Sequence, residues 1–233
     1  MNDPNTPADQ KPLKWGQEWE QSGKGVSPEN DCPIQTINWF DSALYCNWLS
    51  RKEGSTPCYT STGNKLKVKD IQNRDVEVDE WLCDFTANGY RLPTEAEWEV
   101  SCRAGTTTAW SCGKDDVELR EFAVFNVNSR NRTSASGTKL PNGWGLFDVH
   151  GNVFEWCHDW YGQTVAAGRD PQGPQTGSDR VLRGGSWYYP AEYATSAYRT
   201  PHPPDLRLNS IGVRLAQVPG ARKGSAGASG AAE

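Results

Sequence analysis

Two helices are predicted from the spacing of apolar and polar positions along the chain. In the stretch 37–50 the apolar residues recur at the three- and four-residue steps of one helix face, at positions 40, 43, 44, 48 and 49. Asp41 is placed to cap the start of this helix. A second helix follows Thr94, because Thr94 and Glu97 have the spacing of a capping box, and its pattern continues to Arg103.

The remaining pattern indicates short strands joined by long loops. Positions 65–69 and, more weakly, 76–78 alternate between polar and apolar residues as half-buried strands do. The segment 106–141 is rich in Asn, Ser and Gly and is expected to be mostly loop. Further strand-like pieces occupy 144–148, 153–157, 180–187 and 211–215. Two helices and a few short strands in long loops predict an irregular α+β domain.

Composition divides the chain into three parts. Residues 1–30 are polar and are expected to form an N-terminal arm, part of which packs on the domain through Trp15 and Trp19. Residues 31–218 are expected to form the folded domain, and residues 219–233, rich in Pro, Gly, Ala and Ser, a flexible tail. The chain has 11 Trp, whose indole N–H groups are suited to fasten long loops to a small sheet.

Charge and hydropathy argue against several classes of protein. The formal net charge is −5 with Lys and Arg scattered, which argues against a nucleic-acid-binding protein with a basic face. No apolar stretch approaches the ~18 residues that indicate a membrane-spanning helix. The polar start Met1–Pro4 has no signal-peptide pattern. A cytoplasmic location and surface display in a bacterium or phage are both left open, as is the oligomeric state.

The seven cysteines contain no CxxC or other close pair, which argues against a zinc ribbon or a redox motif. Their odd number leaves at least one thiol outside any disulfide. We expect buried, reduced cysteines, with one or two disulfides in an exported form as the alternative.

Four motifs together resemble a known family, the formylglycine-generating (sulfatase-modifying factor) domain. They are Gly-Tyr-Arg-Leu-Pro-Thr-Glu-Ala-Glu-Trp-Glu at 89–99, Gly-Leu-Phe-Asp-Val-His-Gly-Asn-Val-Phe-Glu-Trp at 145–156, Arg-Gly-Gly-Ser-Trp at 183–187 and Gly-Val-Arg at 212–214. Their order and spacing match, and the resemblance runs from about Ile34 to Ala216. It implies a C-type-lectin-like α+β fold with a small mixed sheet, two helices and extensive irregular loops.

The resemblance does not carry over the family's catalytic groups. Its oxidases bind copper through two cysteines that follow the Gly-Gly-Ser motif, and thiolates suit Cu(I), but this chain has no cysteine after Cys157. A related iron-dependent branch needs a histidine cluster, whereas this chain has only three His. Cys102 and Cys157 lie among Trp in helix and strand contexts, where we expect structural roles. We therefore predict no catalytic residue and no enzymatic activity.

Asn152 and Glu155 are the candidate metal ligands. The resemblance implies that this Gly-Asn-x-x-Glu turn helps to hold a structural calcium ion, a hard cation that oxygen ligands suit. The alternative is that Asn152 caps a turn and Glu155 pairs with an arginine. No other cofactor is required by this interpretation.

The segment from about 180 to 216 resembles the variable region of proteins diversified by retroelements. Those systems alter adenines, and an AAC template codon yields, among others, Tyr, Pro, Ala, Thr, His, Leu, Ser or Asn but never Lys, Glu, Gln, Met or Trp. Fifteen positions within 188–210 hold only residues from the permitted set. These candidate ligand-binding residues are Tyr188, Tyr189, Pro190, Tyr193, Ala194, Thr195, Tyr198, Thr200, Pro201, His202, Pro203, Leu206, Leu208, Asn209 and Ser210.

Eight positions between these candidates or directly after them are expected to be fixed: Ser196, Ala197, Arg199, Pro204, Asp205, Arg207, Ile211 and Gly212. Tyrosines are concentrated among the candidates, and binding surfaces favour Tyr for its large contact area and few rotors. The sequence thus predicts a non-enzymatic protein that binds a variable ligand, itself a protein. The alternatives are an ordinary family loop without its cysteines, a formylglycine-generating-type oxidoreductase, and a regulatory domain of a larger signalling protein.

Overall fold

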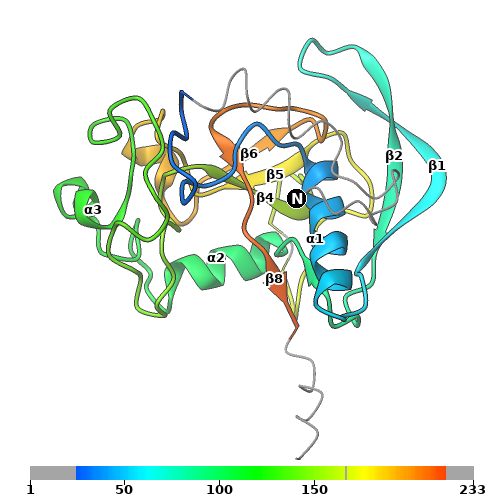
Figure 1. The fold of residues 1–233 in the computed structure, drawn as a ribbon, viewed down its shortest axis with the longest axis horizontal. Coiled ribbons are helices and arrows are strands. Elements are labelled where there is room, and N and C mark those ends of the chain that lie inside the picture. Colours follow the sequence, from blue (N-terminus) through cyan, green and yellow to red (C-terminus); the bar gives the residue numbers. More distant parts are fainter. Residues whose placement is uncertain (1–24, 166, 219–233) are drawn as a thin grey trace, which may run out of the picture.

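A small mixed sheet forms the centre of the molecule (Figure 1). The computed structural model describes residues 25–165 and 167–218. The sheet has the strand order β6-β5-β4-β7, with bounds β4 Phe154–Trp160, β5 Arg180–Arg183, β6 Arg199–His202 and β7 Ile211–Gly212. The β4–β5 and β5–β6 pairs are antiparallel, whereas β4 and β7 are parallel. Segments far apart in the sequence therefore meet in one sheet.

The sheet separates two apolar cores. Helix α1 (Trp39–Lys52) packs its Trp39 with Trp156 and Leu182, whereas helix α2 (Glu95–Arg103) packs with Cys157 and Val181. Neighbouring strand residues thus belong to different cores, because successive side chains of a strand point to opposite faces. Indole donors fasten the layers: Trp39 Nε1 donates to the Cys157 carbonyl at 3.0 Å. The expected fastening of a loop to the sheet is confirmed at Trp156 of β4, whose indole donates to the Ile37 carbonyl at 3.1 Å.

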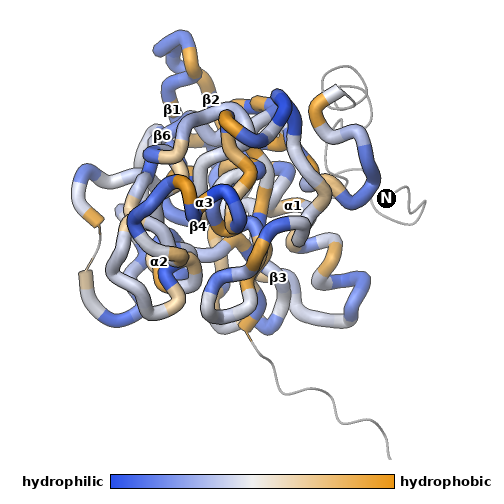
Figure 2. Tube along the Cα trace, turned by 90° about the vertical axis from the view of Figure 1, so that its left-hand side faces the viewer, coloured by the Kyte–Doolittle hydropathy of each residue, from blue (hydrophilic) through white to orange (hydrophobic). Residues whose placement is uncertain are grey.

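A long β-hairpin projects from this body (Figures 1 and 2). It consists of β1 (Tyr59–Lys69) and β2 (Asp75–Cys83), paired antiparallel, and it packs on the body where Val68 and Val78 meet Trp160. After the hairpin, β3 (Tyr90–Arg91) lies beside α1 and pairs with β8 (Ala216–Gln217) close to the end of the described chain.

The α+β class and both expected helices are confirmed, with three differences. The cap of α1 is Asn38, and Asp41 occupies the third helical position of the capping box. Residues 144–148 form turns, because Gly145 and Asp148 adopt positive φ, so the expected strand there was wrong. The expected loop 106–141 contains a short third helix, α3 (Asp116–Phe122).

The two ends of the chain and the cysteine thiols can also be compared with the expectations from the sequence. Trp15, Trp19 and the tail 219–233 lie outside the described residues. Of the expected arm, Val26 packs on the domain through its carbonyl, which accepts the Thr133 N–H at 3.0 Å. All seven cysteines are free and four of them are buried, as expected. No described helix is long and apolar enough to cross a membrane.

Candidate ligand-binding surface

The candidate surface begins where β5 ends in a glycine turn. Gly184 and Gly185 adopt φ of 97° and 74°, a region that favours glycine. A Cβ on Gly185 would lie 2.8 Å from the Ala194 Cα. The turn therefore lets the short 3₁₀ helix η3 (Ala191–Ala194) pack directly on the backbone that follows β5.

The side chain of Arg183 supports the middle of the candidate surface, at residues 196–198. Its guanidinium is fully buried and donates to the carbonyls of Ser196, Ala197 and Tyr198 at 3.0, 2.9 and 2.6 Å. It also pairs with the Glu99 carboxylate of α2. Because one side chain bonds three consecutive carbonyls, the backbone of 196–198 is fixed without a regular secondary structure of its own.

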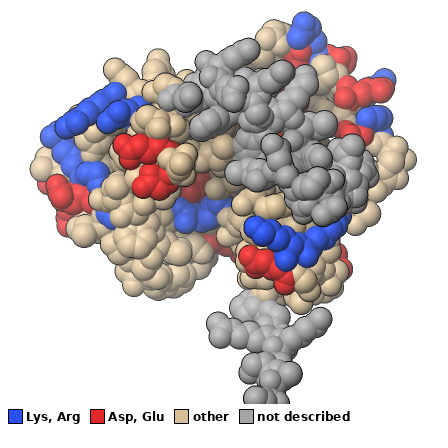
Figure 3. Space-filling model, viewed as in Figure 1, with Lys and Arg blue, Asp and Glu red and all other residues tan. Residues whose placement is uncertain are grey.

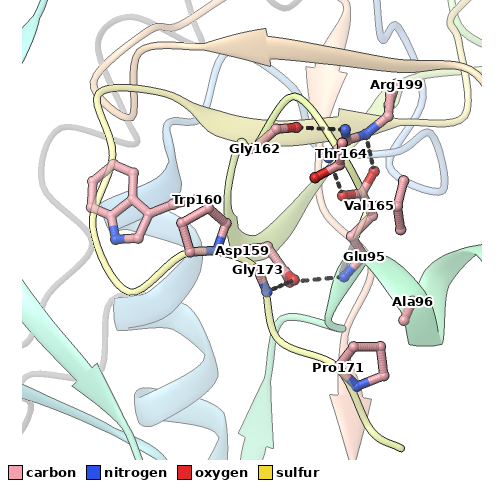
Figure 4. A pocket seen from close by; sticks show the side chains of 11 residues that line it. Glu95, Ala96, Asp159, Trp160, Gly162, Thr164, Val165, Pro171, Gly173 and Arg199 are labelled. Atoms are coloured by element: carbon pink, nitrogen blue, oxygen red, sulfur yellow. Dashed lines mark hydrogen bonds and ion pairs between the residues drawn. The ribbon is translucent and has the colours of Figure 1, made fainter. Parts of the chain in front are cut away.

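Arg199, the next residue, is held in place by the bonds of its own side chain (Figure 4). It makes two hydrogen bonds of 2.6 Å to the Glu95 carboxylate and one of 2.6 Å to the Gly162 carbonyl. The neighbouring Asp159 accepts the N–H groups of Glu95 and Gly173 at 2.8 and 2.7 Å, and burial raises its pKa to about 6. These groups line a small pocket of about 10 Å³, room for about one water molecule.

Most other positions expected to be fixed also have structural contacts. Ser196 is fully buried and donates its N–H to the Ala109 carbonyl, and Pro204 is buried with its carbonyl accepting the Trp39 N–H. Arg207 pairs with Asp41. Ile211 and Gly212 lie buried in β7. Two of the eight, Ala197 and Asp205, are exposed.

A chain of aromatic rings runs along the candidate positions. Ring centroids are 5.3 Å apart for Tyr188 and Tyr189, 5.0 Å for Tyr189 and Tyr193, and 4.9 Å for Tyr193 and Tyr198. Phe154 of β4 lies under this chain, 5.5 Å from Tyr189. The inner rings are half-buried against the main core, whereas Tyr188 is 62% exposed. The tyrosines therefore form a preorganised, partly exposed aromatic face.

The fifteen candidate positions divide by burial. Two, Tyr188 and Pro201, are exposed, and nine are half-buried. Four are buried, namely Ala194, Pro203, Leu206 and Ser210. The side chains of these four belong to the interior, so a ligand that docks on this conformation meets only the other eleven.

The surface continues onto a segment that no sequence pattern indicated. Trp110 donates its Nε1 hydrogen to the Ala191 carbonyl at 3.3 Å and thereby joins the loop before α3 to η3. Residues of this loop and of η3 line an open groove. Trp110 was the one feature of the sequence that could have indicated this contact, because it is a large indole donor in a segment expected to be mostly loop.

A buried histidine and a buried thiol that lie beneath the surface have structural roles. His150 is buried; its Nε2 accepts the Ser111 N–H at 3.0 Å, and its Nδ1 lies 2.8 Å from the Ala194 carbonyl. Burial lowers the His150 pKa to about 4, so the neutral ring donates from Nδ1 and holds η3. Burial raises the pKa of the neighbouring Cys102 to about 12 and that of Cys157 well above its usual value. Neither thiol is activated as a nucleophile.

The candidate calcium ligands already have protein partners. Arg214 donates to both Glu155 oxygens at 2.9 Å, and the Trp98 indole donates to one of them at 2.7 Å. The Asn152 amide exchanges two hydrogen bonds of 3.1 Å with the Ser134 backbone. Within the described ranges no group of three or more His, Cys, Asp or Glu side chains is arranged to hold a metal. This donor set does not fit a calcium site.

Comparison with known proteins places the chain in a family. Residues 7–219 match the Sulfatase-modifying factor enzyme 1-like domain. The chain belongs to this family. It is 31% identical over 215 residues to the formylglycine-generating enzyme of Thermomonospora curvata. The match covers 83% of this chain and 68% of that enzyme. It is 35% identical over 144 residues to the serine/threonine-protein kinase pkn1 of Chlamydia pneumoniae, covering 59% of this chain and 22% of the kinase.

A solved structure extends the comparison to the fold. Treponema denticola variable protein 1 matches with a TM-score of 0.70 and 32% identity, over 82% of this chain and 78% of that one. The resemblance expected from the four motifs is confirmed, as is the C-type-lectin-like fold. The family includes formylglycine-generating enzymes, so membership alone leaves binding and catalysis both open.

Proposed function

We propose that this protein is a non-enzymatic ligand-binding protein whose surface within 188–210 is diversified by a retroelement. The scaffold presents this surface to a ligand, which we propose to be another protein. The observation that carries the proposal is that the residues that hold the backbone of the segment differ from the residues whose side chains are exposed on it. Arg183 holds the backbone of 196–198 from a buried position, and half-buried Arg199 is anchored to Glu95, while eleven of the fifteen candidate side chains are at least partly exposed.

The aromatic face supports binding over chemistry. The tyrosines from Tyr188 to Tyr198 combine large apolar area with polar tips, which is the composition of recognition surfaces. The thiol and histidine beside them, Cys102 and His150, are buried with pKa values shifted away from reactivity. The likeness to a protein named as variable, in the same fold, points in the same direction.

Sequencing the coding region of residues 180–216 from independent isolates tests the proposal. We expect differences at the candidate positions, confined to adenines of a near-copy template beside a reverse-transcriptase gene. The codons of Arg183, Arg199 and Gly185 should stay constant. Identical sequences at 188–210 in all isolates would refute diversification.

A second candidate function is favoured by the identity to a formylglycine-generating enzyme. An oxidase of that type needs copper and a thiolate pair, and no cysteine follows Cys157. Incubation of the protein with Cu(I), oxygen and a cysteine-containing peptide tests it. Formation of an aldehyde at the peptide cysteine, above that in a copper-only control without the protein, would favour the enzyme and overturn the non-enzymatic proposal. A regulatory role within a larger protein, suggested by the kinase match, predicts that the domain occurs fused to a catalytic domain.

A further inference from the structure

An open groove of about 570 Å³ lies beside the aromatic face, between η3 and the loop that leads into α3. Its volume is in the range of ligand-binding clefts. Trp110, Ala191 and Thr195 provide its less polar surface, and Thr195 is one of the candidate variable positions. The hydrogen bond from the Trp110 indole to the Ala191 carbonyl joins the two walls, so the groove is preformed.

The charged lining of the groove is predominantly acidic. Asp115, Asp116 and Glu192 contribute carboxylates from two separate segments, against the single ammonium of Lys114. All four residues are exposed. Figure 3 shows Asp and Glu interspersed with Lys and Arg on the side of the molecule that carries α3, so this excess of acid is local.

The carboxylates differ in what they already bind. Asp115 caps α3 by accepting the Val117 N–H at 2.8 Å. Within the described part of the chain, the carboxylates of Asp116 and Glu192 accept no hydrogen bond and make no ion pair. Two unpaired carboxylates from separate segments therefore line a groove that is also lined by Trp110.

We infer that this groove docks a segment of the partner protein that carries Lys or Arg. This inference rests on the proposed function, because it names the chemistry of the partner that would bind the candidate surface, of which Thr195 is a part. The alkyl stem of a Lys or Arg would lie along Trp110 and Ala191 while its charged end meets Asp116 and Glu192. Complementary charge would fix the orientation of the partner, and the variable side chains would set its identity.

Fluorescence anisotropy with two labelled peptides tests this inference. The probe alternates Arg and Leu over nine residues, and the comparison peptide has Glu in place of Arg. We expect the full chain to bind the Arg peptide and not the Glu peptide. Asp116→Asn combined with Glu192→Gln should weaken binding about fivefold, the size expected when two exposed charge pairs are lost.

A matched variant separates docking from general attraction to an acidic protein. Asp31→Asn combined with Glu77→Gln removes the same two charges from exposed positions elsewhere. It should change the affinity by less than about twofold. Equal weakening in both variants, or binding of the Glu peptide as strong as that of the Arg peptide, would overturn the inference.

The two proposals fail in distinguishable ways. If isolates vary at 188–210 but the affinity for the Arg peptide does not change when the groove charges are removed, the groove inference is wrong and the binding function stands. If the groove variant loses the Arg peptide but isolates are identical at 188–210, the groove binds cationic segments and diversification is wrong.

Discussion

Replacing Arg183 with methionine should destabilise the whole domain by about 3–5 kcal/mol, the cost of removing one partner of a buried ion pair. The side chain is fully buried, and methionine keeps an unbranched apolar stem of similar reach. Three carbonyls, of Ser196, Ala197 and Tyr198, lose their donor, at about 1 kcal/mol each. The ion pair with Glu99 accounts for the remainder.

The expected loss is moderated by partners that stay in place. Glu99 keeps its ion pair with Arg103 at 2.8 Å. Glu95, whose carboxylate lies 3.7 Å from the Arg183 Nε, keeps its two bonds from Arg199. Neither carboxylate is therefore left buried without a cation. The loss should therefore lie near the lower end of this range, about 3 kcal/mol, which is still a large share of the 5–15 kcal/mol by which ordinary domains are stable.

Urea unfolding followed by tryptophan fluorescence measures this loss directly. Arg169→Met is the matched control, because Arg169 pairs with Asp170 at 3.5 Å and both side chains are almost fully exposed. The control should change stability by less than about 0.5 kcal/mol. A loss below about 1 kcal/mol in Arg183→Met would show that the 196–198 backbone is fixed by other contacts and would refute the argument.

Three further predictions follow from the same structure. Burial lowers the pKa of His150 to about 4 and of His158 to about 3, and it raises the pKa of Asp159 to about 6. Between pH 6 and 4 the unfolded chain therefore binds about one proton more than the folded chain, so the stability measured by urea titration should fall by about 1.4 kcal/mol for each unit that the pH falls. A stability that rises on acidification would contradict these assignments. Iodoacetamide should label all seven cysteines in denaturant but leave the four buried ones, Cys46, Cys58, Cys102 and Cys157, unmodified in the native protein, as read by intact mass. Calcium at millimolar concentration should not raise the Tm above its value in chelator, since Arg214 already neutralises Glu155; a rise that Asn152→Ala abolishes would restore the calcium site.

The helices could be predicted because their signals are local. Thr94 and Glu97 form the capping box that their spacing indicates, each bonding the backbone of the other. At α1 the sequence offers two acceptors, Asn38 and Asp41, and the same reciprocal bonds place Asn38 at the cap and Asp41 inside the helix. A single capping residue chosen by type cannot distinguish the two roles; the reciprocal spacing of the box can.

The elements that pattern alone missed depend on distant contacts. Residues 144–148 are mostly apolar, but the chain there must turn so that Asn142 can bond the backbone of Ser101 and Leu146. Helix α3 has seven residues, too few to show an apolar period, and its buried Leu119 finds its partners in Trp110 and Phe125. Such partners are visible only in the folded chain.

The sequence could predict which segment forms the candidate surface, but not which of its side chains are buried. Residue types and spacing separated Arg199 from the neighbouring candidate positions, and the structure gives Arg199 a buried carboxylate partner. The same reasoning could not tell Leu206, which enters the main core, from Tyr188, which faces solvent, because both belong to the permitted set. The groove beside Trp110 was missed because it joins two segments about eighty residues apart, across the hydrogen bond to Ala191.

The way the surface is built explains how it could accept new side chains. A strand pair would fix the backbone through its own N–H and C=O groups, but β6 and β7 have only four and two residues. The segment depends instead on side chains outside the exposed candidates: the guanidinium of Arg183, the indoles of Trp187 and Trp110, and the ring of His150. These groups bond backbone carbonyls, which every residue type supplies. A change of side chain at an outward position therefore leaves the bonds that hold the backbone intact, and recognition can vary while the fold does not.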